Sequence, residues 1–243
     1  MRRSFVFILA LSLVSASLAH AGLLDDLEKK SRELTGKKKS SGGELDSNTI
    51  IAGLKEALSI GAQNGVKLVS REDGYFGNQL IRILVPEKIQ KTAKLLRKAG
   101  FGKEVDKFEL SMNRAAEKAG PRALAFFIDA IREMSIPDAV KILRGKDTEA
   151  TEYLRAKTYE RIYGVFKPVV SSAMNDVGVT RSFKEMMDKT KNVPLLKKES
   201  VDLDHYVTSK ALDGLFLMVG QEEKKIRKDP VARVTDLLKK VFR

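Results

Sequence analysis

Apolar residues recur every three or four positions along most of the chain, which is the spacing of one face of an α-helix. The clearest run begins after Asp46 and Ser47, either of which can cap a helix, and continues to Val69. Gly61 and Gly65 lie within it, and because a glycine lets another backbone approach closely, we expect a second helix to pack there. The apolar positions of the run are Ile50, Ile51, Leu54, Ala57, Leu58, Ala62, Val66 and Val69.

The same spacing and its end signals predict further helices downstream. Ser135-Ile136-Pro137-Asp138 combines a cap, a proline in the first turn and an acid three residues after the cap. Gly120-Pro121 should break one helix, Pro168 should kink the longest one, and Gly178 should end it. These helices are expected near 86–98, 105–119, 124–131, 136–145, 148–178, 180–189, 204–229 and 234–242. The fold class is therefore all-α, a single bundle of seven to nine helices.

Two stretches do not follow the helical spacing. Glu72 to Asn78 is a turn cluster with two aromatic residues, Tyr75 and Phe76, and we expect this loop to fold back onto the core because aromatic side chains bury a large area. Leu80 to Val85 is a short extended segment that ends at Pro86. It either pairs with nothing or pairs with its own copy in a dimer.

The first 21 residues have the layout of a secretory signal peptide. A short basic start precedes an apolar run of 14 residues, Phe5 to Leu18, and Ala19-His20-Ala21 predicts cleavage between Ala21 and Gly22. Such a run spans about 21 Å as a helix, against a bilayer core of roughly 30 Å, so we expect no transmembrane helix in the mature chain. The short start favours the general secretory route over twin-arginine export, and the protein is expected to be periplasmic or secreted.

This layout divides the chain into a signal peptide (1–21), a flexible basic linker (22–45) and a helical domain (46–243). The linker prediction rests on the lysine, serine and glycine residues between Gly36 and Gly43, a stretch with no apolar residue to bury. The linker should act as an N-terminal tether for the folded part.

Composition excludes several kinds of chemistry. The chain has no cysteine, so disulfides, thiol catalysis and cysteine-ligated metals are excluded. Of its two histidines, His20 leaves with the signal peptide, and His205 by itself cannot build a site that needs two. We therefore expect no metal, no cofactor and no enzymatic activity, although an enzyme that uses only carboxylates stays open as an alternative.

The chain is strongly basic, with a formal net charge of +13 that falls to near +11 without Arg2 and Arg3. Such a charge attracts anionic lipid or an acidic envelope polymer. Specific nucleic-acid binding is not expected, because the aromatic residues fall mostly on apolar helix faces. The candidate contacts with an anionic surface are Lys88, Lys91, Lys94, Arg97, Lys98, Lys224, Lys225, Arg227, Lys228, Lys239 and Lys240. Two such patches on one face could hold the protein at a membrane, whereas one patch by itself is not expected to do so, and each taken singly is by default an ordinary solvated helix face.

One polar group falls among the apolar positions of two predicted helices. Asn113, Arg114 and Glu117 occur on one helix, and Asp129 lies between Ile128 and Ile131 on the next. An Arg114–Asp129 pair would form the centre of this candidate cluster, as a structural ion pair or as a ligand site. Lys210 and Asp213 are expected to pair on a helix surface at i, i+3.

Several runs together resemble the bacterial exported proteins grouped as domain of unknown function 4197. The resemblance covers nearly all of the mature chain and implies an exported helical domain. It brings no catalytic residue and no substrate. The matching runs are Ile50 to Leu58, Leu110 to Ala119, Val177 to Thr180, Lys210 to Phe216, Glu222-Glu223, Ile226-Arg227, Asp229-Pro230 and Thr235 to Phe242.

Export, positive charge and the missing catalytic groups favour one function. The protein is expected to be a non-enzymatic helical protein that binds an anionic or amphipathic partner at the cell envelope. A carrier that encloses an apolar ligand, with room left by Gly61 and Gly65, is the first alternative. A structural homodimer or scaffold built through Leu80 to Val85 is the second.

Overall fold

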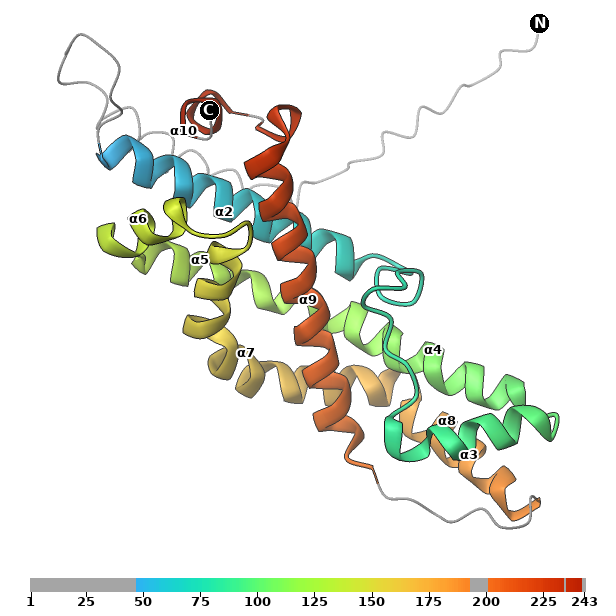
Figure 1. Ribbon diagram of the computed structural model, residues 1–243. Helices are drawn as coiled ribbons and strands as arrows, with labels where there is room; N and C mark the ends of the chain where they lie inside the picture. Colours follow the sequence, from blue (N-terminus) through green and yellow to red (C-terminus); the bar gives the residue numbers. More distant parts are fainter. Residues whose placement is uncertain (1–46, 193–200, 234, 242–243) are drawn as a thin grey trace, which may run out of the picture. The chain divides into compact units, whose positions relative to one another are not determined.

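The computed structural model describes residues 47–192, 201–233 and 235–241, and all of these belong to one compact unit. They form nine α-helices and three short 3-10 turns, with no strand among them, so the predicted all-α fold is confirmed (Figure 1). Within the described residues, no helix is apolar over enough of its length to cross a bilayer. The predicted signal peptide 1–21, its cleavage site at Ala21–Gly22 and the linker 22–45 lie outside the described residues.

The helices follow the predicted order along the chain. They are α2 (Ser47–Ser70), α3 (Glu87–Lys98), α4 (Gly102–Ala119), α5 (Leu124–Glu133), α6 (Ile136–Arg144), α7 (Glu149–Asp176), α8 (Val179–Asp188), α9 (Leu203–Lys228) and α10 (Asp236–Val241). The 3-10 turns are η1 (Gly120–Ala123), η2 (Lys189–Asn192) and η3 (Pro230–Ala232).

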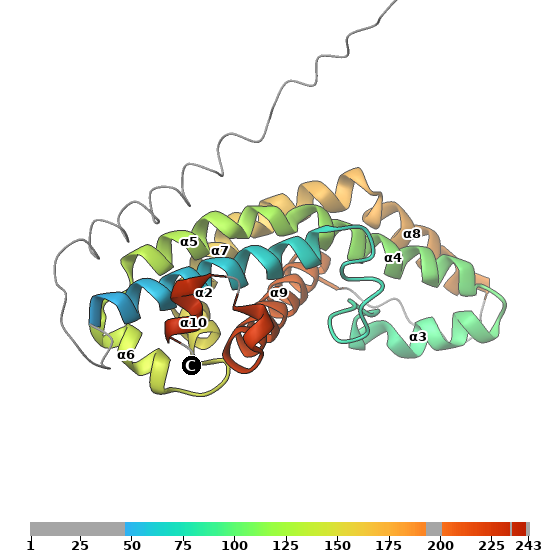
Figure 2. The same ribbon diagram turned by 90° about the horizontal axis from the view of Figure 1, so that it is seen from above.

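The centre of the fold is the crossing of α2 and α9, which both views show (Figures 1 and 2). Gly65 lies at this crossing: a Cβ atom placed there would come within 2.8 Å of Val219 Cγ2 and 3.1 Å of its Cα. At Gly53, a Cβ atom would meet Val241 Cγ2 of α10 at 2.5 Å. The two glycines of α2 therefore allow α9 and α10 to pack directly against its backbone, as expected for Gly65 from the sequence.

Local signals set several of the helix ends. Ser135 and Asp138 form a reciprocal capping box at the start of α6, and Asp202 accepts a hydrogen bond from the His205 backbone N–H at the start of α9 (2.9 Å). Gly178 ends α7 with a φ of 75°. The expected break at Gly120-Pro121 is milder than predicted, because η1 carries the chain from α4 into α5 without a loop.

Candidate functional site

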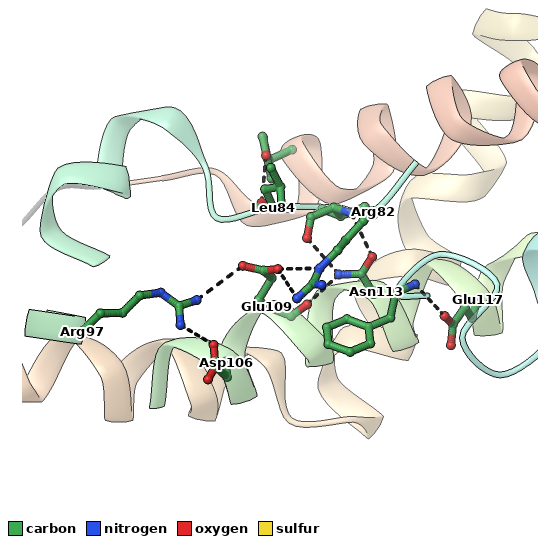
Figure 3. Close-up of polar contacts among 10 residues, drawn as sticks. Arg82, Leu84, Arg97, Asp106, Glu109, Asn113 and Glu117 are labelled. Carbon is green, nitrogen blue, oxygen red and sulfur yellow. Dashed lines mark hydrogen bonds and ion pairs between the residues drawn. The ribbon is translucent and has the colours of Figure 1, made fainter. Parts of the chain in front are cut away.

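The extended segment 82–86 connects the turn after α2 to α3, and a side chain of α4 holds it in place. Asn113 accepts a hydrogen bond from the Ile83 backbone N–H and donates one to the Ile83 carbonyl, both at 2.8 Å (Figure 3). Its Nδ2 also donates to the Glu109 carbonyl at 2.8 Å. Asn113 is fully buried, so this amide does for Ile83 what a neighbouring strand would do in a sheet.

Glu109, one turn before Asn113 on α4, joins the segment to α3. Its Oε1 lies 2.7 Å from the Arg82 guanidinium, and its Oε2 lies 3.7 Å from that of Arg97 (Figure 3). Arg97 also pairs with Asp106. Arg97, one of the candidate surface contacts, is therefore exposed but paired with two carboxylates of α4.

Glu117 and Arg114 anchor the turn that precedes the segment. Glu117 Oε1 accepts hydrogen bonds from the backbone N–H groups of Tyr75 (3.0 Å) and Phe76 (3.2 Å), and its other oxygen pairs with Arg114 (2.6 Å). Arg114 also pairs with Asp73 at 2.8 Å. Asn113, Arg114 and Glu117 therefore share one structural task, which is to bind the chain between residues 72 and 83 to α4.

The predicted Arg114–Asp129 pair was wrong. The Asp129 carboxylate lies 3.7 Å from Arg132 on its own helix and is half exposed. Asp129 occupies the solvent side of α5, so it does not join the Arg114 cluster. The i, i+3 pair of Lys210 and Asp213 was also wrong, because Asp213 pairs with Arg155 of α7 and the Lys210 ammonium lies 6.0 Å from the centre of the Tyr206 ring.

Between the anchored segment and α9 lies an open groove of about 640 Å³. Tyr206 fixes the distance between its walls by donating a hydrogen bond from its hydroxyl to the Leu84 carbonyl (3.0 Å). Gly214 forms part of the lining, and a Cβ atom there would come within 2.8 Å of the buried Tyr75 ring. The groove is lined by Leu80, Ile81, Arg82, Leu84, Pro86, Glu87, Lys88, Gln90, Val201, Asp202, His205, Tyr206, Lys210, Asp213, Gly214 and Leu217.

Tyr75 ties the turn after α2 to the same helix. Its side chain is fully buried, and its hydroxyl donates to the Ala211 carbonyl at 2.6 Å. Burial, together with the nearby Glu117 carboxylate, raises the pKa of Tyr75, so the hydroxyl keeps its proton and its role as donor. The expectation that this loop folds back onto the core is confirmed.

The outer face of α3 carries a row of lysines. Lys88, Lys91, Lys94 and Lys98 are exposed and follow the helical repeat, with the exposed Leu95 among them. Within the described residues, none of these four lysines makes an ion pair. The row therefore differs from Arg97, which points to α4.

The other predicted basic patch, near the end of α9, is mostly neutralised by neighbouring acids. Lys225 pairs with Glu222, Lys228 with Asp147, and Lys239 with Asp236. Lys224 is exposed and makes no ion pair among the described residues. The side chain of Lys240 lies outside the described residues. Figures 1 and 2 place this end of α9 far from α3, so the two patches do not share one face.

Arg227, also in that patch, is part of the interior. Its side chain is only 11% exposed, pairs with Glu223 at 2.9 Å and donates to the Ile142 carbonyl at the end of α6 (2.8 Å). Glu223 in turn accepts hydrogen bonds from the backbone N–H groups of Ala150 and Thr151 at the start of α7. One ion pair of α9 thus satisfies the end of α6 and the beginning of α7 together.

Other chemistry is sparse in the part of the chain that the structure describes. It contains no group of three or more histidine or acidic side chains placed to hold a metal ion. The Nδ1 atom of His205 lies 2.7 Å from the Tyr163 hydroxyl, at the edge of the groove. The space beside Gly61 measures about 10 Å³, which is room for one water molecule and not for an apolar ligand.

Comparisons with known proteins assign the family. A family model described as a protein of unknown function, DUF4197, matches residues 44–243, and the chain belongs to this family. A search of curated proteins and a search of solved structures both found no match.

Proposed function

We propose that this member of the DUF4197 family is an exported protein of the periplasm or the extracellular space that binds an anionic membrane surface and catalyses no reaction. The observation that carries the proposal is the lysine face of α3, formed by Lys88, Lys91, Lys94 and Lys98. Neighbouring carboxylates pair with most of the other candidate contacts, whereas these four exposed lysines make no ion pair among the described residues.

The geometry of the lysine face suits a lipid surface. The four lysines lie on one side of a helix, and Leu95 between them is 42% exposed, so an apolar side chain can touch the interface while the ammonium groups meet headgroups. Each lysine near an anionic surface contributes on the order of 1 kcal/mol. Four of them give reversible binding that should weaken as salt rises.

Two of the three acids that line the groove already have structural roles, which supports the non-enzymatic part of the proposal. Asp213 is paired with Arg155, and the hydrogen bond from the His205 backbone N–H lowers the pKa of Asp202, which caps α9. Two carboxylates that already serve as ion-pair partner and helix cap are poorly placed to act together as acid and base.

Reversing three charges of the lysine face should weaken membrane binding about a hundredfold or more, because about 1 kcal/mol is lost per lysine. The variant is Lys91→Glu/Lys94→Glu/Lys98→Glu, tested by co-sedimentation with vesicles of equal parts phosphatidylglycerol and phosphatidylcholine. The matched control, Lys67→Glu/Lys146→Glu/Lys157→Glu, makes the same change in net charge at exposed lysines that are not candidate surface contacts.

The control should keep most of the wild-type affinity, and wild type should release these vesicles at high salt and ignore pure phosphatidylcholine. Equal loss of vesicle binding in both variants would show that binding depends on net charge and not on the lysine face. Failure of wild type to bind anionic vesicles at low salt would contradict the proposal outright.

Export has a direct readout. The protein recovered from the periplasm or medium of an expressing bacterium should have the mass of a chain whose first residue is Gly22, because the signal peptidase cuts after Ala21. Accumulation of the chain in the cytoplasm with Met1 to Ala21 still attached would refute this part of the proposal.

A further inference from the structure

The groove between segment 82–86 and α9 concentrates exposed leucines. Leu80, Leu84 and Leu217 are 66%, 52% and 44% exposed, and all three line this one concave surface. Isolated exposed leucines need no explanation, but three around a single hollow mark a site for an apolar group. The volume of about 640 Å³ lies within the range of roughly 300–1,000 Å³ that is usual for small-molecule sites.

Two lysine ammonium groups that line the groove make no ion pair among the described residues. Arg82 is paired with Glu109, Asp213 with Arg155, and Asp202 caps the N-terminus of α9. Lys88, Lys210 and Glu87 remain, and no ion pair forms among them. Lys210 lies on the same helix as Leu217, and a carboxylate or another monoanion at its ammonium group would balance its charge.

The backbone edge of the segment argues against an added peptide strand. The Ile83 N–H and C=O face α4, where Asn113 binds both. On the opposite edge, the Leu84 carbonyl already accepts the Tyr206 hydroxyl, so α9 stands where an incoming strand would have to lie. Side chains, not backbone groups, therefore offer the contacts in this groove.

We propose that the groove binds one fatty acid, with its carboxylate at Lys210 and its alkyl chain along Leu80, Leu84 and Leu217. A monoanion with one apolar chain matches the unpaired ammonium group of Lys210 and the exposed leucines. Each buried CH₂ group contributes about 0.8 kcal/mol. The groove shares Lys88 with the lysine face of α3 but contains none of the three lysines reversed in the membrane-binding test, and the proposal does not depend on membrane binding.

The test uses dodecanoate and dodecyltrimethylammonium, two amphiphiles with the same chain and opposite charge. Isothermal titration calorimetry on the exported chain, below the micelle concentration of each and without vesicles, should show one dodecanoate bound per chain. Dodecyltrimethylammonium should bind at least tenfold more weakly. Leu217→Asp should weaken dodecanoate binding at least tenfold, and Lys210→Glu should do the same while reversing the preference toward the cation.

Leu95→Asp is the matched control, because it places the same charge at a similarly exposed leucine outside the groove. It should leave dodecanoate binding unchanged, and so should the triple reversal of the lysine face. Circular dichroism should confirm that each variant is folded; all three substituted residues lie on helix surfaces.

Absence of dodecanoate binding, or binding that Leu217→Asp and Lys210→Glu leave intact, would overturn the proposal. So would sedimentation as a dimer that Leu217→Asp dissociates, because a second copy of the chain would then cover the groove. Membrane binding is measured with other variants and with vesicles, so either proposal can fail while the other holds.

Discussion

Replacing Glu223 by alanine should lower the free energy of unfolding by about 3–5 kcal/mol, because the change removes a buried carboxylate that pairs with Arg227 and accepts hydrogen bonds from the start of α7. Glu223 accepts hydrogen bonds from the Ala150 N–H (3.0 Å), the Thr151 N–H (2.8 Å) and the Thr151 hydroxyl (2.8 Å). It also pairs with Arg227, which is itself nearly buried. Alanine would remove the acceptor of three donors and the counter-charge of Arg227 in one step.

Urea denaturation followed by circular dichroism measures the loss. Glu222→Ala is the matched control: Glu222 is the preceding residue, equally buried, but its carboxylate serves the Asn64 amide (3.3 Å) and the exposed Lys225. We expect the control to cost about 1 kcal/mol or less. Glu223→Ala/Arg227→Met should cost less than the sum of the two single changes, because the two side chains form one ion pair that either change breaks.

A cost of Glu223→Ala no greater than that of Glu222→Ala would contradict the assigned role. A double variant that is less stable than Glu223→Ala would show that Arg227 stabilises the fold mainly through the carbonyls at the end of α6.

Replacing Asn113 by leucine should cost about 3 kcal/mol and release the segment that forms one wall of the groove. Leucine has a similar shape but no polar atom, so the Ile83 N–H and carbonyl would both lose their partner inside the protein, at about 1–3 kcal/mol each. Hydrogen exchange should locate the effect, with the Ile83 amide exchanging much faster while amides in the middle of α2 stay protected.

Asn113→Asp gives the same position a dependence on pH. The carboxylate would face the carbonyl oxygens of Ile83 and Glu109, so burial and these acceptors should raise its pKa in the folded state. The folded chain would then hold a proton that the unfolded chain has released, and stability should fall as pH rises from 5 to 8. Wild type should not lose stability in this way, and Asn64→Leu, at an exposed asparagine, should cost far less than Asn113→Leu. If the stability of Asn113→Asp did not depend on pH, this would argue against the placement of the Asn113 side chain beside the Ile83 and Glu109 carbonyls.

Helices and their ends could be predicted because the determining residues are close together in sequence. Ser135 and Asp138 are three positions apart, and Gly178 acts through its own backbone. Gly120-Pro121 misled the prediction because proline is tolerated in a first turn, and here it lies in a 3-10 turn between two helices. Whether a helix stops or continues at such a pair depends on packing that local sequence does not contain.

The sequence indicated some polar residues of the candidate site but not their partners or the groove. Asn113 and Glu117 stood out as polar residues among apolar positions, but their partners lie 30 and 42 residues away, at Ile83 and Tyr75. Asp129 was assigned to the cluster because Ile128 and Ile131 flank it. Residues within one turn of a helix can nevertheless point to opposite faces, one buried and one exposed. The groove was missed, and the signal that could have revealed it was Leu84, an apolar residue out of phase with buried Ile83 and Val85.

The pairing of α2 with α9 also has a consequence for how the chain is made. The first described helix leaves the ribosome early, whereas its main partner begins at Leu203 and α10 follows only after that. At about 5–20 residues per second, α2 waits on the order of ten seconds with the backbone at Gly53 and Gly65 uncovered. The face of α2 around Gly53 and Gly65 therefore stays without its main partners until α9 and α10 have been made.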